Sequence, residues 1–337
     1  MSGSARRALC DLLSCTHPIV LAGMGGVARS ELVAAVTAAG GFGFLGMVRE
    51  PPSLIAAEVE RLRARGVERF GVNIIPAATE PALLEQQVET VIGLRVPVVT
   101  LFWDIDRDLV ARLREAGIIV VYQVGSAREA MDAERAGAQV IIAQGREAGG
   151  HVRGDTPLKA LLPSVTAAVS VPVLAAGGLA TGADMVAVSA LGAAGIVLGT
   201  ALLGAEESYA HLYHKQRLIE AGPDDTLLTD IFHINWPDGA RVRVLSTAAA
   251  SGALGTGDGD RVIIGADDGR PIYLFSTDSP LRSTSGDLGA MALYAGTGVG
   301  AVTAIRPAAA IIDDIAGEAK RLKDAALMPR ARDRRAR

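Results

Sequence analysis

Short apolar runs alternate with amphipathic segments from residue 18 to residue 201. Within a run the apolar residues are consecutive rather than alternating with polar ones, which is typical of a strand buried on both faces of a parallel sheet. Eight such runs follow one another, at 18–23, 42–46, 69–75, 96–102, 117–123, 139–144, 171–177 and 194–200.

Helical patterns fill the intervals between these runs. Residues 80–94 and 106–117 each place leucine and valine residues on one face at helical spacing. Ser30, Ser126 and Thr181 stand where helix N-caps are needed. Eight successive strand–helix units predict a (β/α)₈ barrel of the TIM type. The alternative is a doubly wound sheet, which usually has fewer parallel strands.

The alternation stops after Ala201. Residues 205–222 have a helical pattern, and a long stretch rich in Gly, Asp, Ser and Thr follows, with strand-like runs at 241–245, 261–265 and 271–275. We therefore predict a smaller cap region inserted after strand eight. The predicted divisions are a (β/α)₈ barrel at 1–204, a cap and substrate region at 205–303, a helix returning to the barrel at 304–327, and a basic disordered tail at 328–337.

Composition narrows the class of protein. The chain has 337 residues, half of them apolar, and a net charge of −4, which suits a large core and does not suit a nucleic-acid surface. Its two cysteines, Cys10 and Cys15, make no disulfide framework and fit a reducing cytoplasm. The apolar runs are too short to cross a bilayer. We expect a cytoplasmic protein with no metal, nucleic-acid or membrane partner, and a homodimer is compatible with the sequence.

The residues at the ends of the predicted strands are mostly glycines and amides. Active sites of (β/α)₈ barrels lie at the carboxyl ends of the strands. The candidates found there are Gly23, Met24, Gly25, Asn73, Gln123, Gln144, Gly149, Gly150, His151, Gly177, Gly178, Gly199 and Thr200.

Two glycine turns have the pattern of a phosphate site. Gly177-Gly178 and Gly199-Thr200 follow strands seven and eight, the pair whose loops commonly bind phosphate in barrels. Glycine lets backbone N–H groups approach phosphate oxygens closely. The alternative is that these glycines only turn the chain. A dinucleotide fingerprint at Gly23–Gly26 is disfavoured, because no acidic residue ends strand two.

Asn73, Gln123 and Gln144 are neutral donors and acceptors around one rim, as the edge of a flavin ring requires; ordinary packing or loop capping is the alternative. His151 follows two glycines, Gly149 and Gly150. That spacing lets the backbone pass close to a cofactor while the imidazole points toward a substrate, where it can act as a general base or hydrogen-bond donor.

Several motifs resemble the nitronate monooxygenase family, formerly called 2-nitropropane dioxygenases. They are PIVLAGMGGVARSELVAAVTAAGGFGFLG, FGVNII, AQGREAGGH, PVLAAGGLATG, GIVLGTAL and LYAGTGVGAV. The resemblance implies non-covalent FMN and oxidation of alkyl nitronates by O₂ to a carbonyl compound and nitrite, with His151 as the catalytic histidine. It implies that Gly177, Gly178, Gly199 and Thr200 hold the phosphate, and that Gly23, Met24, Asn73, Gln123, Gln144 and Gly150 surround the ring and ribityl chain. Gly25 and Gly149 belong to the same loops.

Two other functions stay open at this point. FMN-dependent enoyl-acyl-carrier-protein reductases resemble the chain in the barrel, the glycine turns and the histidine, and they use NAD(P)H. A non-catalytic flavin-binding barrel is the third reading, and His151 argues against it because a passive binder needs no imidazole there. In the cap, His233, Trp236 and Tyr273 are either substrate wall or cap core, and we favour core.

Overall fold

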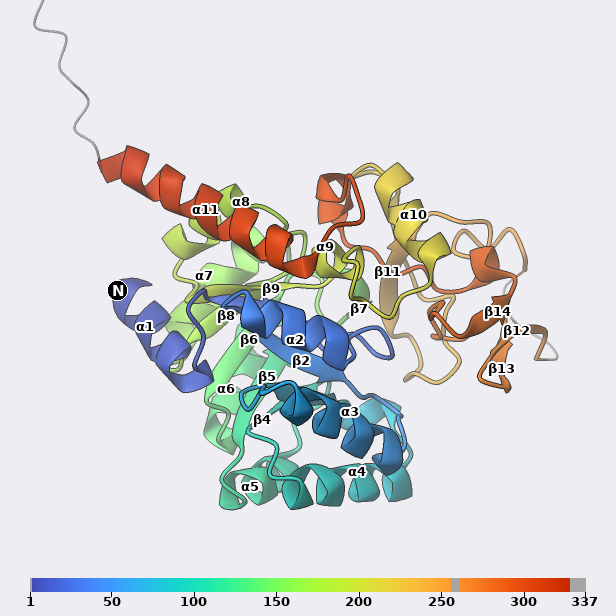
Figure 1. Ribbon diagram of the computed structural model, residues 1–337, viewed down its shortest axis with the longest axis horizontal. Helices are drawn as coiled ribbons and strands as arrows, with labels where there is room; N and C mark the ends of the chain where they lie inside the picture. The colour runs from blue at the N-terminus through green and yellow to red at the C-terminus, as the bar shows by residue number, and fades with distance from the viewer. Residues whose placement is uncertain (1, 256–260, 328–337) are drawn as a thin grey trace, which may run out of the picture.

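A barrel of eight parallel strands forms the centre of the computed structural model, which describes residues 2–255 and 261–327 (Figure 1). The predicted basic tail at 328–337 lies outside the described residues. The strands close in the order β1-β2-β3-β4-β5-β6-β8-β9, and each coincides with one of the predicted apolar runs. They are β1 (Ile19–Leu21), β2 (Phe42–Gly46), β3 (Gly71–Ile74), β4 (Val98–Phe102), β5 (Ile119–Val124), β6 (Val140–Gln144), β8 (Val173–Ala176) and β9 (Gly195–Leu198). The (β/α)₈ barrel is confirmed.

Helices cover the outside of this barrel. Among the described residues, seven of them lie between successive barrel strands: α2 (Ser30–Ala38), α3 (Pro52–Ala64), α4 (Pro81–Gly93), α5 (Arg107–Glu115), α6 (Ala127–Ala136), α7 (Leu158–Ala168) and α8 (Gly182–Ala190). The remaining position is taken by α11 (Ala308–Leu327), which packs against α8 and α2. The returning helix therefore begins at Ala308 rather than at residue 304. No helix within residues 2–255 and 261–327 is long and apolar enough to cross a membrane.

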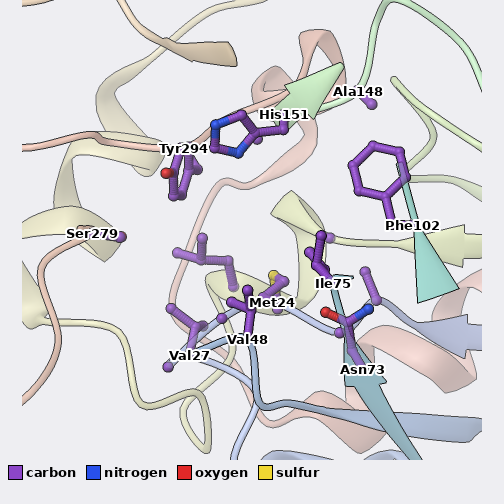
Figure 2. A pocket seen from close by; sticks show the side chains of 18 of the residues that line it. Met24, Val27, Val48, Asn73, Ile75, Phe102, Ala148, His151, Ser279 and Tyr294 are labelled. Carbon is purple, nitrogen blue, oxygen red and sulfur yellow. The ribbon is translucent and has the colours of Figure 1, made fainter. Parts of the chain in front are cut away.

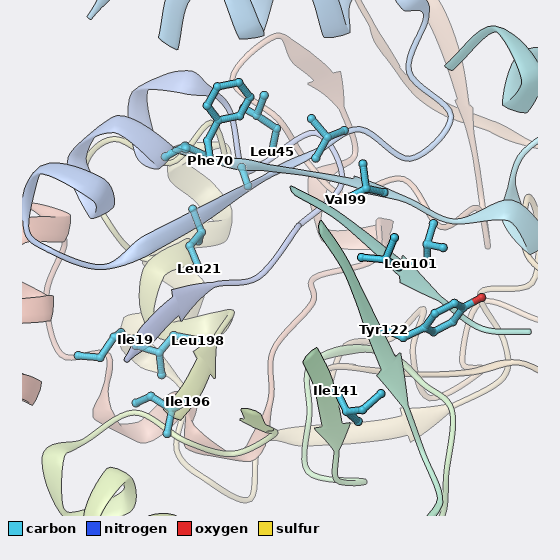
Figure 3. Packing of buried hydrophobic residues seen from close by; sticks show 14 of the residues in the cluster. Ile19, Leu21, Leu45, Phe70, Val99, Leu101, Tyr122, Ile141, Ile196 and Leu198 are labelled. Carbon is cyan, nitrogen blue, oxygen red and sulfur yellow. The ribbon is translucent and has the colours of Figure 1, made fainter. Parts of the chain in front are cut away.

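The main hydrophobic core lies between the strands and these helices. Figure 3 shows Ile19, Leu21 and Leu198 from neighbouring strands pointing into it. Consecutive strand residues are buried because every strand has helices on one side and the barrel interior on the other. The unbroken apolar runs in the sequence are the consequence of this double burial.

Two of the three predicted N-caps are correct. The Ser126 hydroxyl accepts from the Glu129 N–H at 3.2 Å, and Thr181 forms a reciprocal capping box with Asp184. The prediction for Ser30 is wrong, because Ser30 is already the first residue of α2. Its N–H donates instead to the Glu58 carboxylate of α3 at 2.7 Å, so a neighbouring helix supplies the acceptor.

The sequence analysis did not assign an N-terminal helix, α1 (Ser2–Leu13). This helix closes the barrel at the amino ends of its strands. Leu9 and Leu13 are fully buried in one cluster with Val20, Phe42 and other residues of the barrel interior. This end is filled by apolar side chains, so the space for a ligand lies at the opposite, carboxyl end of the strands.

The segment between β9 and α11 forms the cap. It contains α9 (Thr200–Leu203), α10 (Leu212–Glu220), β10 (Thr226–Thr229), β11 (Arg241–Leu245), β12 (Ile263–Asp267), β13 (Arg270–Tyr273), β14 (Thr284–Gly286), and short 3₁₀ helices at Leu288–Ala290 and Thr297–Ala301. A further 3₁₀ helix, Pro76–Ala78, follows β3. The cap strands form one sheet in the order β13-β12-β14 and contribute β10 and β11 to a second. The boundary at residue 204 between two domains stays a prediction.

The helix predicted at 205–222 is shorter than expected. Only Leu212–Glu220 is helical, and the side chain of His211 caps its start. Upstream, the largely buried Lys215 ammonium donates to the carbonyls of Ala205, Glu206 and Ser208. Because these carbonyls accept from a side chain, the segment before His211 folds around the lysine instead of continuing the helix.

Candidate active site

A cavity of about 240 Å³ opens at the carboxyl ends of the barrel strands and is covered by the cap. Figure 2 shows side chains from the barrel, among them Met24 and Asn73, facing His151 and Tyr294 across it. All the site residues selected from the sequence line this one cavity: Gly23, Met24, Gly25, Asn73, Gln123, Gln144, Gly149, Gly150, His151, Gly177, Gly178, Gly199 and Thr200. The structure brings them together, and their individual roles stay predictions.

The two glycine turns after β8 and β9 form one side of the cavity. Gly177 and Gly178 have φ angles of 113° and 70°, in the left-handed region that favours glycine. A Cβ atom on Gly178 would lie 2.7 Å from the Thr297 hydroxyl oxygen, so a side chain there would also collide. The Thr200 hydroxyl accepts from the Gly296 N–H at 2.9 Å, which ties the second turn to the 295–298 loop.

The first βα turn and Asn73 form the floor of the cavity. A Cβ atom on Gly23 would lie 2.3 Å from the Asn73 Cβ, so only glycine allows this approach. The Asn73 Nδ2 donates to the Thr100 carbonyl at 3.3 Å, whereas its Oδ1 is buried and has no partner among the described residues. A buried polar atom without a partner is costly, which indicates that a bound molecule completes its hydrogen bonding.

Gln144 lines the cavity, but most of its carboxamide is used by the protein itself. Its Nε2 donates to the His151 carbonyl at 2.8 Å, and its Oε1 accepts from the Arg153 N–H at 3.2 Å. Gln144 therefore holds the backbone on both sides of Val152. Gln123 reaches the cavity from β5.

His151 lies on a strand, whereas the sequence analysis placed it in a loop. This strand, β7 (Gly150–Val152), pairs antiparallel with β11 of the cap, with His151 opposite Val242. Periodicity does not reveal such a strand, because its partner lies about ninety residues later in the chain, and long-range pairing leaves no local pattern. The cap thus helps to fix the backbone that carries the imidazole.

The imidazole of His151 is buried and stacked. Its ring centroid lies 3.5 Å from that of Trp236, with the planes 11° apart. Its Nε2 is buried without a hydrogen-bond partner in the part of the chain that the structure describes. Burial, and secondarily the nearby Arg49 guanidinium, lowers the pKa of His151 well below its usual value. At neutral pH the ring is therefore uncharged.

Of the three cap residues left open by the sequence, Trp236 lines the cavity. The expectation of cap core is wrong for Trp236, because its indole stacks on His151. His233 and Tyr273 are not among the lining residues; His233 Nδ1 lies 2.9 Å from the Ile231 carbonyl, and Tyr273 packs under the Arg261 guanidinium.

Charged residues of the cavity wall escaped the sequence analysis. They are Arg49, Glu50, Asp267, Arg270 and Asp278. Three of them come from the cap, whose position over the barrel is not visible in the sequence. The other two lie three and four residues after the end of β2, and that placement alone was the available signal. Tyr294, which was also missed, is partly buried, its hydroxyl donates to the Thr277 carbonyl at 2.6 Å, and desolvation raises the pKa of this phenol.

Comparison with known proteins identifies the family. Residues 6–83 and 75–318 match the family model described as nitronate monooxygenase. The chain belongs to the nitronate monooxygenase family. It is a flavin-dependent oxidoreductase of the TIM-barrel type. The cavity fits a flavin, because it combines the Gly177-Gly178 turn, which excludes side chains, with the Asn73 oxygen, which has no partner among the described residues.

Similar proteins within and around this nitronate monooxygenase family carry different names. A (3aS,4S,5R,7aS)-5-hydroxy-7a-methyl-1-oxo-octahydro-1H-indene-4-carboxyl-CoA dehydrogenase from Mycobacterium tuberculosis is 37% identical over 245 residues, 72% of this chain and 66% of that protein. The chain thus spans just under two thirds of the length of this relative. A probable nitronate monooxygenase from Staphylococcus haemolyticus is 32% identical over 268 residues, 66% of this chain and 75% of that protein. The structure of nitroalkane oxidase from Streptomyces ansochromogenes superposes with a TM-score of 0.77 at 29% identity, covering 95% of this chain and 99% of that one.

Proposed function

We propose that this protein binds FMN and oxidises alkyl nitronates with O₂ to a carbonyl compound and nitrite. The observation that carries the proposal is the uncharged imidazole of His151 in the cavity wall, whose buried Nε2 has no hydrogen-bond partner among the described residues. Family membership and the similarity to a nitroalkane oxidase support a nitro compound as substrate.

The glycine turns are the proposed site of the FMN phosphate. Gly177, Gly178, Gly199 and Thr200 would hold it through backbone N–H groups and the threonine hydroxyl. The ring and ribityl chain would lie against Gly23, Met24, Gly25, Asn73, Gln123, Gln144, Gly149 and Gly150. When bound, FMN would supply the redox chemistry, taking electrons from the substrate and passing them to O₂.

His151 would handle the proton and orient the substrate. An uncharged imidazole can accept the α-proton of a neutral nitroalkane or donate a hydrogen bond to a nitronate oxygen. A base whose pKa lies well below neutrality is a weak base, so this environment favours the preformed anion over slow α-proton removal. Trp236 on one ring face and Gln144 on the backbone keep the imidazole in place.

An FMN-dependent enoyl-thioester reductase that uses NAD(P)H is the second candidate. The specific observation in its favour is the similarity to an enzyme named as a carboxyl-CoA dehydrogenase. In both candidate reactions the reacting substrate carbon is bonded to, or conjugated with, an electron-withdrawing group. That carbon would lie beside His151 in either case, so both reactions would use the same site residues. The electron donor or acceptor distinguishes them.

Anaerobic mixing tests the two candidates directly. FMN-loaded protein is mixed with an alkyl nitronate, NADH or NADPH while flavin absorbance is followed. Loss of absorbance with the nitronate alone supports the proposed function, whereas loss with NADH or NADPH supports the enoyl-thioester candidate. No change with any of them, together with no turnover in air, would favour a non-catalytic flavin-binding barrel.

The His151→Asn variant tests the role of the imidazole. We expect kcat/KM for neutral nitroalkanes to fall by roughly 10²–10⁴, because a general base is lost, and to fall less for a preformed nitronate, which needs no proton removed. His233→Asn is the matched control, since it removes a histidine that does not line the cavity. Unchanged turnover of both substrates by His151→Asn would remove His151 from the mechanism.

A further inference from the structure

The charged wall of the cavity has no role in the chemistry described so far. Arg49 belongs to it and lies three residues after the end of β2. Its φ angle is 58°, a left-handed conformation that is uncommon for a residue with a side chain. Strained backbone of this kind persists where the surrounding structure requires it, and it clusters at ligand sites.

The guanidinium of Arg49 is only partly satisfied by the protein. Its Nη2 lies 3.6 Å from the Asp278 Oδ1, too far for a hydrogen bond. Its Nε is buried and has no partner among residues 2–255 and 261–327. Arginine presents its donors as a planar fork that matches two oxygens on one atom, so a free donor edge suits a carboxylate-like or nitro-like group.

Arg49 shares the cavity with two other unpartnered nitrogens. His151 Nε2 and Trp236 Nε1 are also buried without hydrogen-bond partners in the described part of the chain. Arg49, His151 and Tyr294 line the same cavity, and the positive charge of Arg49 contributes to the lowered pKa of His151. Three side chains with unused nitrogen atoms therefore surround the same space.

Arg270 is the other arginine of this wall, and its situation differs. Its side chain is 57% exposed, and it lies 3.7 Å from Asp267 and 3.9 Å from Asp278. It is thus held between two carboxylates near solvent, where charge–charge interactions are weak. Arg49 has a single ion-pair contact, 3.6 Å from Asp278, its side chain is only 23% exposed, and its buried Nε has no partner among the described residues. Because His151 is uncharged, Arg49 is the better-placed cation for an anionic substrate.

We propose that Arg49 binds the negatively charged oxygens of the substrate and selects for a small anion with two oxygens on one atom. Nitronates belong to this class, as do nitrate and short carboxylates. The proposal rests on the proposed function only in taking this cavity as the active site. It assigns Arg49 to substrate binding, with the Asp278 carboxylate 3.6 Å from the guanidinium Nη2 as its ion-pair partner.

Nitrate and propionate are suitable probes, because they have the oxygen pattern of a nitronate and cannot be oxidised in the same way. FMN-loaded wild-type protein, Arg49→Met, Arg49→Lys and Arg270→Met are titrated with sodium nitrate while flavin absorbance and heat of binding are recorded. We expect Arg49→Met to raise the Kd by roughly 10- to 100-fold, Arg49→Lys to raise it less, and Arg270→Met to change it by less than about threefold.

A second measurement needs no variant. Wild-type protein should bind propionate at least about tenfold more tightly than propionamide, which has the same shape and no charge. Equal affinity for the two, or equal nitrate affinity in wild type and an FMN-loaded Arg49→Met, would overturn the proposal. This comparison decides the matter even where Arg49→Met fails to fold.

Turnover separates this proposal from the proposed function. Nitrate binding that depends on Arg49, in a wild-type protein that does not oxidise nitronates, would leave the anion site standing and refute nitronate oxidation. Nitronate oxidation with a KM that Arg49→Met leaves unchanged would refute the anion site and leave the proposed function standing.

Discussion

His214 offers a quantitative test of how separate segments of the cap are held together. Its ring is completely buried on α10. Nε2 lies 3.1 Å from the Tyr294 carbonyl and Nδ1 lies 3.3 Å from the Ser279 hydroxyl. Ser279 and Tyr294 both line the cavity, so this histidine connects two parts of the cavity wall. Burial lowers its pKa from 6.5 to about 4.

The direction of the pH effect follows from where the proton binds first. The unfolded chain protonates His214 near pH 6.5, whereas the folded protein resists protonation until about pH 4. Protonation therefore favours the unfolded state. The contribution of uncharged His214 to the free energy of unfolding is fully present above pH 6.5 and is lost as the pH falls toward 4. The difference in pKa lowers the free energy of unfolding by about 3 kcal/mol once the pH is below both pKa values, and by about 2 kcal/mol at about pH 5.

Urea unfolding of wild type and His214→Asn measures this contribution. Asparagine keeps hydrogen-bonding groups but does not titrate. We expect the free energy of unfolding to fall between about pH 7.5 and about pH 5 by roughly 2 kcal/mol less in the variant than in wild type. His151 is buried uncharged and acts in the same direction, but it is present in both proteins and cancels in the difference. The same pH dependence in both proteins would refute the argument.

Two further predictions concern the cavity at the carboxyl ends of the barrel strands and the apolar packing at their amino ends. Gly178→Ala and Gly66→Ala introduce a side chain at similar φ angles, 70° and 74°, but only the Gly178 Cβ meets a neighbour. Each should cost about 1–2 kcal/mol of stability from the left-handed backbone, whereas only Gly178→Ala should weaken FMN binding, by at least about tenfold in a fluorescence titration. Leu13→Ala should lower the free energy of unfolding by roughly 2–5 kcal/mol and leave the FMN Kd unchanged, because Leu13 fills the end of the barrel opposite the cavity. Equal FMN affinity of the two glycine variants, or FMN loss in Leu13→Ala, would contradict these assignments.

The barrel strands were predictable because each is buried on both faces. That burial leaves an unbroken apolar run, such as residues 96–102, which needs no knowledge of the partner strand. The helix at 205–222 was overestimated for the opposite reason. Its first residues have a helical pattern, yet their carbonyls accept hydrogen bonds from the Lys215 ammonium. A tertiary contact of this kind cannot be recognised from the spacing of apolar residues.

The residues at the strand ends could be collected from the sequence, since a parallel barrel brings all carboxyl ends to one rim. For this reason Asn73, Gly178 and His151 were found together although they lie far apart in the chain. Their hydrogen bonds could not be predicted. The Gln144 carboxamide proved to bind backbone around β7, a use that depends on where that strand lies in three dimensions.

The sequence by itself determined the barrel and the set of glycine, amide and histidine positions at its rim. Each barrel strand leaves an unbroken apolar run in the sequence, and parallel strands bring all their carboxyl ends to the same rim. Only the tertiary structure decided what faces His151. The cap brings Trp236 against the imidazole and Asp278 toward Arg49. Those contacts join segments separated by many residues, and their formation depends on the folding of the whole chain rather than on any local pattern.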